Sequence, residues 1–178
     1  LSPTGEYLVC GVGLGGDENA QLWLLDARTG RAEALTQSPE VRHGVPSWSP
    51  DGSVIFFNSN EANGRDFSIY RMDLRTRTKT VLAEMEGWNT PGDVSVDGRY
   101  LLVSHFDSNT NSDIYRVEIA SGTREHMTPH EGQALYYAGR FDATGGTLYL
   151  LSNDNPDGIT RRAAMDLASR KVRFLDTE

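Results

Sequence analysis

The tetrapeptide Ser49-Pro50-Asp51-Gly52 decides the fold, because imperfect copies of it recur along the chain. The glycines of these copies lie at positions 5, 52, 98 and 145, so successive copies are 46 or 47 residues apart. An Asp-Gly pair suits a tight turn, because Asp bonds to the turn backbone and Gly accepts a positive φ. We therefore assign a structural role in turns between strands to Asp51, Gly52, Asp97 and Gly98.

Two further markers keep nearly the same period. An acidic residue closes a short apolar run at positions 26, 73, 118 and 166, and an apolar residue closes a later run at positions 35, 82, 127 and 175. Three markers that keep one spacing indicate a repeat protein. We expect one propeller segment over residues 1–178, with repeats at about 1–40, 41–87, 88–132 and 133–178.

Each repeat is predicted to form short strands. Its apolar runs are β-branched or aromatic and too brief for helices. The second strands are expected at 7–10, 54–57, 100–103 and 148–151, and the third at 21–26, 68–73, 113–118 and 161–166, the last being a poor strand sequence. Inner strands are expected at 45–49, 91–95 and 138–142, and the first repeat lacks one.

Four strands in a unit of about 46 residues predict an all-β fold, a β-propeller of four-stranded antiparallel blades. A sandwich keeps no such period, and a solenoid repeats on shorter or helical units. Because the first blade lacks its inner strand, we expect the chain to be part of a larger propeller. The apolar residues at positions 1, 48, 94 and 141 are expected to pack in its core.

The turn into the outer strand carries glycine in only two of the repeats. Thr29-Gly30 and Ser121-Gly122 contain it, whereas Thr76-Arg77 and Ser169-Arg170 do not. Because a non-glycine residue rarely adopts a positive φ, we expect a different turn type in the second and fourth repeats.

Composition excludes several classes of partner. The 178 residues carry a formal net charge of −8, which argues against nucleic acid and anionic membrane surfaces. No apolar run approaches the roughly 18 residues of a membrane span. The single cysteine, Cys10, excludes an internal disulfide framework. We expect no cofactor, and we expect a cytoplasmic location while leaving a periplasmic or secreted one open.

The repeats resemble those of a known group of propellers. The Ser-Pro-Asp-Gly marker, the strand Asp113–Glu118 and outer strands ending in Leu-Thr resemble the WD-like repeats of TolB-like proteins and of prolyl oligopeptidase-family serine peptidases. The stretches Gly92–Val103 and Met127–Gly132 are similar to the peptidase branch. That resemblance implies an α/β-hydrolase domain as partner, with the propeller filtering the peptides that reach its catalytic serine.

The chain itself contains no catalytic signature. The Gly-x-Ser-x-Gly nucleophile motif of such hydrolases is absent, and none of His43, His105, His126 and His130 accompanies a nucleophile. We therefore expect this segment to be inactive alone, whatever its parent protein does. Two functions stay open: a gating and scaffolding segment of a peptidase, and a TolB-like protein-binding propeller with no enzymatic role. Its partners are then the rest of its propeller and the hydrolase domain, or another copy of itself.

Two groups of residues are candidate binding sites. Arg42, Trp88 and Arg140 lie near the starts of inner strands, which border the channel of a propeller, and Arg65 lies in a loop of the second repeat. An arginine there is able to bind a peptide carboxylate with two hydrogen bonds. The weaker candidate is a calcium site with EF-hand-like spacing at Asp107, Asn109, Asn111 and Asp113, although a strand after Asp113 argues against a compact cage.

Overall fold

The computed structural model describes residues 1–13, 15–44 and 46–176. Its 15 strands form two compact units, Leu1–Pro91 and Gly92–Glu178, and each unit is described by itself. The described residues contain no helix with the length and apolar character needed to span a membrane.

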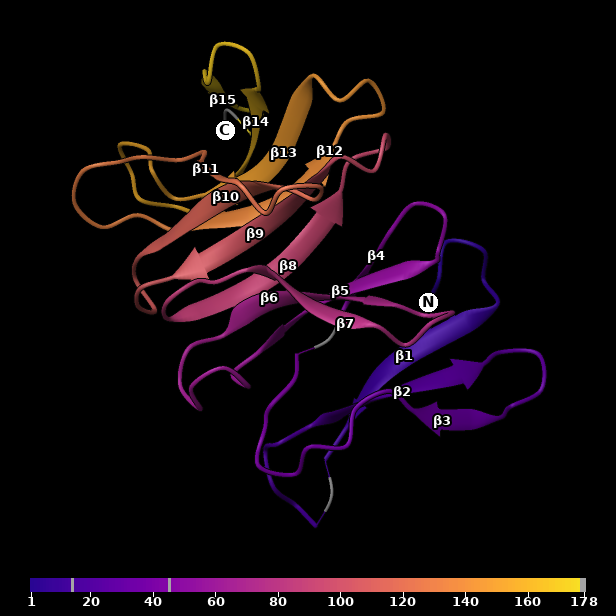
Figure 1. Cartoon of the computed structure of the whole chain (residues 1–178). Helices are drawn as coiled ribbons and strands as arrows, with labels where there is room; N and C mark the ends of the chain where they lie inside the picture. Colours follow the sequence, from indigo (N-terminus) through magenta and orange to yellow (C-terminus); the bar gives the residue numbers. More distant parts are fainter. Residues whose placement is uncertain (14, 45, 177–178) are drawn as a thin grey trace. The chain divides into compact units, whose positions relative to one another are not determined.

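The first unit contains two antiparallel sheets (Figure 1). The first has the order β1-β2-β3, and the second has the order β4-β5-β6-β7. Their strands are β1 (Tyr7–Val12), β2 (Gln21–Asp26), β3 (Ala32–Ala34), β4 (Ser47–Trp48), β5 (Val54–Ser59), β6 (Ser68–Asp73) and β7 (Lys79–Ala83). Strands that are consecutive in sequence are neighbours in each sheet, which is the arrangement of a propeller blade.

The second unit repeats this arrangement. Its sheets have the orders β8-β9-β10-β11 and β12-β13-β14-β15. The strands are β8 (Trp88–Val94), β9 (Tyr100–Phe106), β10 (Ser112–Glu118), β11 (Arg124–His126), β12 (Tyr136–Phe141), β13 (Thr147–Ser152), β14 (Arg161–Asp166) and β15 (Val172–Phe174). The boundary between the units falls within β8, so its first four residues, up to Pro91, belong to the first unit.

The predicted fold class is confirmed, with three strands in the first blade and four in each of the others. The inner strand expected at 45–49 is only two residues long, and residue 45 lies outside the described part of the chain. The stretch 161–166, judged a poor strand from its sequence, is a regular one that pairs with β13 and β15. Its small residues Ala163 and Ala164 are buried, so they suit a strand that is closely covered.

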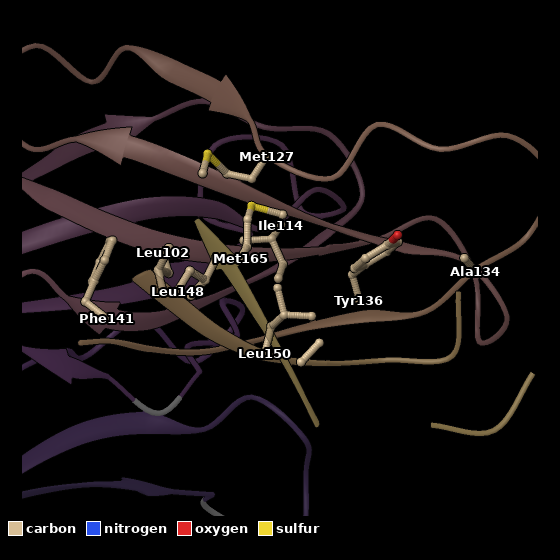
Figure 2. Close-up of a cluster of buried hydrophobic side chains, with 10 residues drawn as sticks. Leu102, Ile114, Met127, Ala134, Tyr136, Phe141, Leu148, Leu150 and Met165 are labelled. Carbon is tan, nitrogen blue, oxygen red and sulfur yellow. The ribbon is translucent and has the colours of Figure 1, made fainter. Parts of the chain in front are cut away.

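Within each unit, apolar side chains of neighbouring blades form a shared core. In the first unit, Val9, Leu22 and Leu24 of the first blade pack with residues of the second, namely Ile55, Phe57, Tyr70 and Met72. In the second unit, Figure 2 shows the corresponding cluster, where Leu102, Ile114 and Met127 meet Leu148, Leu150 and Met165. These side chains alternate along their strands, as expected of sheets that bury a face against a neighbour.

The residues expected before each turn differ in burial. Val94 and Phe141 are buried, and Trp48 is partly buried against the core of the first unit. Leu1 is 69% exposed, so its assignment to the core was wrong. Among the described residues, no inner strand pairs with β1, and Leu1 consequently lies in no sheet.

The prediction of two turn types was also wrong. Arg77 and Arg170 adopt φ of 60° and 61°, close to the 71° and 73° of Gly30 and Gly122. In all four turns the residue at this position donates its backbone N–H to the carbonyl oxygen of the residue that closes the preceding strand, such as Asp73 for Arg77. The two arginines therefore occupy the left-handed conformation that glycine occupies elsewhere.

An ion pair accompanies each of these unusual arginines. Arg77 contacts the Glu33 carboxylate of the preceding blade, and Arg170 contacts the equivalent Glu125. The left-handed backbone thus directs a long cationic side chain toward the outer strand of the neighbouring blade. Both pairs are partly exposed, so each contributes little to stability by itself, at most about 1 kcal/mol.

We predict that Gly30→Ala lowers the free energy of unfolding by about 1 kcal/mol. A Cβ at this position meets no atom within 4 Å, so the loss reflects only the left-handed backbone. Chemical denaturation measures it. Gly146→Ala is the matched control, because its added Cβ would lie at an ordinary 3.5 Å from Thr144 and its φ is unremarkable. Equal losses in the two variants would contradict the explanation.

Candidate functional site

The candidate site in the first unit is a surface group in which Arg42 stacks on Trp88. The Arg42 guanidinium carbon lies 5.1 Å from the centroid of the Trp88 ring. Nη1 of Arg42 donates to Oε2 of Glu18 at 2.8 Å. Trp88 is 38% exposed, and the centroid of its ring lies 4.2 Å from that of the buried Phe67. We call Arg42, Trp88 and Phe67 the Arg–Trp platform.

Arg42 is positioned by its backbone. Its N–H donates to Oδ1 of Asn60 at 2.9 Å, and its carbonyl oxygen accepts from the N–H of Asn60. The next residue, His43, pairs with Ser59 in an isolated bridge that extends the edge of β5. These bonds fix Arg42 beside the end of β5, so its side chain is free to reach Trp88.

Hydrogen bonds from two buried side-chain amides hold the segment that carries Trp88. The amide nitrogen of Asn89, which is fully buried, donates to the carbonyl oxygens of Phe67 and Glu86 at 3.0 and 2.9 Å. The amide of Asn58, also buried, donates to the carbonyl oxygen of Asn89. Because both amides bond to main-chain oxygens, the segment that carries Trp88 is held in one conformation. A half-exposed tryptophan on a segment held in this way is already organised for binding.

Arg65 is not part of the platform. It is engaged with its own neighbour, since Nη2 lies 2.8 Å from Oδ2 of Asp66. Asp66 also accepts the N–H of Gly87 at 3.0 Å, next to Trp88. The hydrogen bonds from the Arg65 side chain and from the Gly87 N–H hold the pKa of Asp66 far below its usual range. Arg65 therefore fixes the loop under the platform, and its own side chain remains 80% exposed.

Arg140 does not lie at the start of its strand, as the sequence suggested. It is the fifth residue of β12. It belongs to the second unit, whereas Arg42 belongs to the first. A β-bulge precedes it, because the register of β12 against β13 shifts between Ala138 and Arg140. A Cβ on the intervening Gly139 would lie 2.2 Å from the carbonyl oxygen of Tyr149, so this close approach requires glycine. The Arg140 side chain is exposed.

The oxygens of the calcium candidate do not converge. Asp113 turns into its blade, where Oδ1 lies 2.8 Å from Nε2 of His126 and accepts from Thr128 Oγ1 at 3.1 Å. Oδ1 of Asn111 lies 2.9 Å from Nε2 of His130, while Nδ2 of Asn111 donates to Asp107. Asn109 is exposed in the loop. Over the described ranges, no three His, Cys, Asp or Glu side chains are placed to hold a metal ion.

The turn residues lie where the repeat places them. Gly52 and Gly98 have φ of 73° and 70°. Oδ1 of Asp51 accepts from Ser49 Oγ at 2.6 Å and from the N–H of Ser53 at 3.1 Å. Asp97 makes the same pair of bonds with Ser95 and Arg99. The serine hydroxyl contributes most to lowering the pKa of each aspartate, followed by the backbone N–H.

Several residues of the site were missed by the sequence analysis. Phe67 and Glu18 lie in loops of different repeats, and nothing in their local sequence distinguishes them from other loop residues. The Asn58–Asn89 pair joins residues 31 positions apart, which no short motif reports.

These four antiparallel sheets with one repeated turn define a β-propeller domain. Residues 1–157 match the family described as prolyl oligopeptidase, N-terminal beta-propeller domain, and the chain belongs to that family. The resemblance inferred from the repeats is thereby confirmed.

Individual relatives agree with this assignment. The chain is 28% identical over 174 residues to dipeptidyl aminopeptidase BIII of Pseudoxanthomonas mexicana, a match that covers 92% of this chain and 24% of that protein. Among solved structures, TolB from Acinetobacter baumannii has a TM-score of 0.76 at 22% identity, over 97% of this chain and 41% of that one. A puromycin-hydrolyzing peptidase of Mycobacterium tuberculosis has a TM-score of 0.70 at 14% identity, covering 98% and 28%. The chain thus spans less than half the length of each.

A buried histidine beside the platform generates a pH prediction. His43 is 2% exposed, neither ring nitrogen has a hydrogen-bond partner within the described residues, and its ring meets the edge of Phe57. Burial, assisted by the charge of Lys79, lowers the pKa of His43 from 6.5 to about 4. Between these values the unfolded chain binds a proton that the folded chain does not. Stability from this group is complete above pH 6.5 and is lost as the pH falls toward 4.

The free energy of unfolding of the native chain is expected to fall between pH 6.5 and 4. We therefore predict that His43→Leu makes this fall smaller by up to about 3 kcal/mol. At pH 7 the variant stays folded, because leucine leaves no polar group unpaired in the same space. Denaturation curves measured at several pH values in this window test the prediction. A variant whose stability falls with acid as steeply as that of the native chain would contradict it.

Proposed function

We propose that this propeller scaffolds an α/β-hydrolase domain in a serine peptidase and gates the access of peptides to it. The observation that carries the proposal is the family match over residues 1–157. The similarity to a dipeptidyl aminopeptidase along 92% of the chain supports the same activity for the parent protein. The chain supplies no nucleophile motif of its own, so in this proposal the chemistry belongs to the partner domain.

The Arg–Trp platform is the surface proposed to act on peptides. Tryptophan and arginine are the residues that contribute most to many binding interfaces. Arg42 has one nitrogen bonded to Glu18, whose side chain is 84% exposed. Exposed ion pairs are weak, so a peptide carboxylate is able to replace Glu18 while an apolar peptide side chain covers Trp88. Such contacts would hold a peptide at the propeller before it reaches the catalytic serine.

A TolB-like, purely protein-binding propeller is the second candidate. The chain resembles TolB as well as peptidase propellers in fold, with TM-scores of 0.76 to TolB and 0.70 to the puromycin-hydrolyzing peptidase, so this candidate stands beside the first. Both identities are low, so these two values compare folds and not activities. The contiguous gene sequence separates the candidates. A Gly-x-Ser-x-Gly motif followed by Asp and His supports the peptidase, and its absence together with a secretory signal supports the TolB-like role.

We predict that residues 1–178 alone do not hydrolyse peptide p-nitroanilides or p-nitrophenyl esters, because the segment lacks a nucleophile motif. The parent protein is the positive control and is expected to turn over these substrates and to be blocked by a serine-directed inhibitor. Turnover by the repurified segment that the same inhibitor abolishes would contradict the prediction.

We further predict that Arg42→Ala and Trp88→Ala in the parent peptidase raise KM for longer acidic peptides by about 3–10-fold. The expected kcat on a small ester is unchanged, since such a substrate needs no contact with the platform. Arg31→Ala is the matched control, because Arg31 is exposed directly before β3 and its side chain makes no ion pair among the described residues. Steady-state kinetics on both substrates measure the effect, and identical values for Arg42→Ala and Arg31→Ala would contradict it.

A further inference from the structure

The loop between β5 and β6 contains the only Asn-Gly pair of the chain, Asn63-Gly64, and both residues are exposed. An asparagine before glycine is chemically labile. The backbone nitrogen of the next residue attacks the side-chain amide, and glycine has no Cβ to obstruct that approach. Asn109 is also exposed in a loop, but it precedes Thr110, whose branched side chain does obstruct the approach. The sequence thus distinguishes Asn63 from an otherwise similar loop asparagine.

The Asn63 side chain is the centre of the hydrogen bonds that hold this loop. Its Oδ1 accepts the backbone N–H of Arg65 at 3.0 Å and that of Asp66 at 2.8 Å. Its Nδ2 donates to Oδ2 of Asp66 at 2.9 Å. Both ends of the amide are therefore in use, and the donor end is essential because an ionised carboxylate only accepts hydrogen bonds.

Asp66 connects this loop to the Arg–Trp platform. Its Oδ1 accepts the N–H of Gly87 at 3.0 Å, and Gly87 is the residue before Trp88. The carbonyl oxygen of Gly87 accepts in turn from the N–H of Phe67, whose ring packs on Trp88. A chemical change at Asn63 therefore reaches the segment that carries Trp88 through one intervening side chain.

We propose that Asn63 is a site of spontaneous deamidation, with water as the co-reactant, and that the product disconnects the loop from Trp88. In the first step the backbone nitrogen of Gly64 loses its proton to solvent and bonds to Cγ of Asn63. The Cγ–Nδ2 bond breaks, and Nδ2 takes up a proton and leaves as ammonia. Water then opens the cyclic imide at either of its carbonyl carbons, and the nitrogen of Gly64 recovers a proton. The products are aspartate and isoaspartate, and nothing is oxidised or reduced.

The aspartate product removes the donor that Asp66 uses. A carboxylate oxygen then takes the place of Nδ2, which lies 2.9 Å from Oδ2 of Asp66. Hydrogen bonds from Arg65 and Gly87 hold the pKa of Asp66 far below its usual range, so Asp66 stays ionised and the two like charges repel. The side chain of Arg65 is 80% exposed, so it offsets only part of this repulsion.

The isoaspartate product disturbs the loop further. It routes the main chain through the former side chain, so that Cγ becomes a backbone carbon and one extra carbon enters the chain. The oxygen that accepted the N–H groups of Arg65 and Asp66 is then displaced with the backbone. Either product therefore withdraws support from Asp66, and with it the acceptor of the Gly87 N–H.

The modification is tested by incubating the parent protein at mildly alkaline pH and quantifying the modified peptides by mass spectrometry. Asn63 is expected to convert at least about tenfold faster than Asn109, the matched asparagine before threonine. The denatured protein is the control for the reaction conditions. Equal rates at the two asparagines would overturn the proposal, as would an Asn63 that stays intact in the native protein while the denatured protein converts it.

The effect on the segment that carries Trp88 is tested with two charge-matched variants. Asn63→Asp supplies the aspartate product directly, and Asn109→Asp adds the same charge to an exposed loop of the second unit. Hydrogen exchange resolved at single amides is expected to be at least about tenfold faster at Gly87 in Asn63→Asp than in the native protein, and unchanged in Asn109→Asp. An unchanged rate at Gly87 in Asn63→Asp would overturn the proposed disconnection.

The consequence for peptides rests on the proposed function. If the platform holds peptides, Asn63→Asp raises KM for longer acidic peptides by about 3–10-fold and leaves kcat on a small ester unchanged. Faster exchange at Gly87 with an unchanged KM in both Asn63→Asp and Trp88→Ala would refute the peptide-binding role and leave the modification site in place. An Asn63 that does not deamidate, beside a raised KM in Trp88→Ala, would refute the modification site alone.

Discussion

The structure depends on the need of each sheet to bury an apolar face against a neighbouring blade. A four-stranded sheet is too thin to have an interior, so its stability comes from the side chains that meet between two sheets. Leu22 and Leu24 are buried because Tyr70 and Met72 cover them, and Ile114 is buried because Met165 covers it. The period of the sequence follows from this constraint, since each unit presents the same two faces.

This constraint explains which parts of the fold were predictable. Strands with regular alternation, such as Val54–Ser59, are recognisable because each strand carries the whole pattern. The strand Arg161–Asp166 was undervalued, because Ala163 looks weak alone and acquires its meaning only in the cluster with Leu102 and Ile114 of the preceding blade. The turn at Arg77 was misjudged for a related reason. The contact with Glu33 in the neighbouring blade joins residues 44 positions apart, so the sequence of the turn itself does not report it.

The candidate site shows the same limit more strongly. Arg42 and Trp88 were selected because both precede inner strands, and the structure brings them together. Arg65 was selected from a loop of the second repeat, but its guanidinium bonds to Asp66 and stabilises the loop. The sequence places these two arginines in different segments, but it does not show which of them meets an aromatic ring. What separates them is the distance to an aromatic ring supplied by another loop, and that distance depends on blade packing and on the buried amides of Asn58 and Asn89.

The positions that preserve the fold and the positions that are free to acquire function are therefore separate in this chain. Asp51 and Asp97 repeat the same bonds in the turn that follows the inner strand of their blades. Glu18 and Phe67 lie in loops of different repeats, and these loops contact the arginine and the exposed tryptophan of the platform. Because the repeated turns and the shared cores position each blade, the loops need only supply side chains to a surface that is already rigid. A propeller can thus change what it binds without changing how it folds.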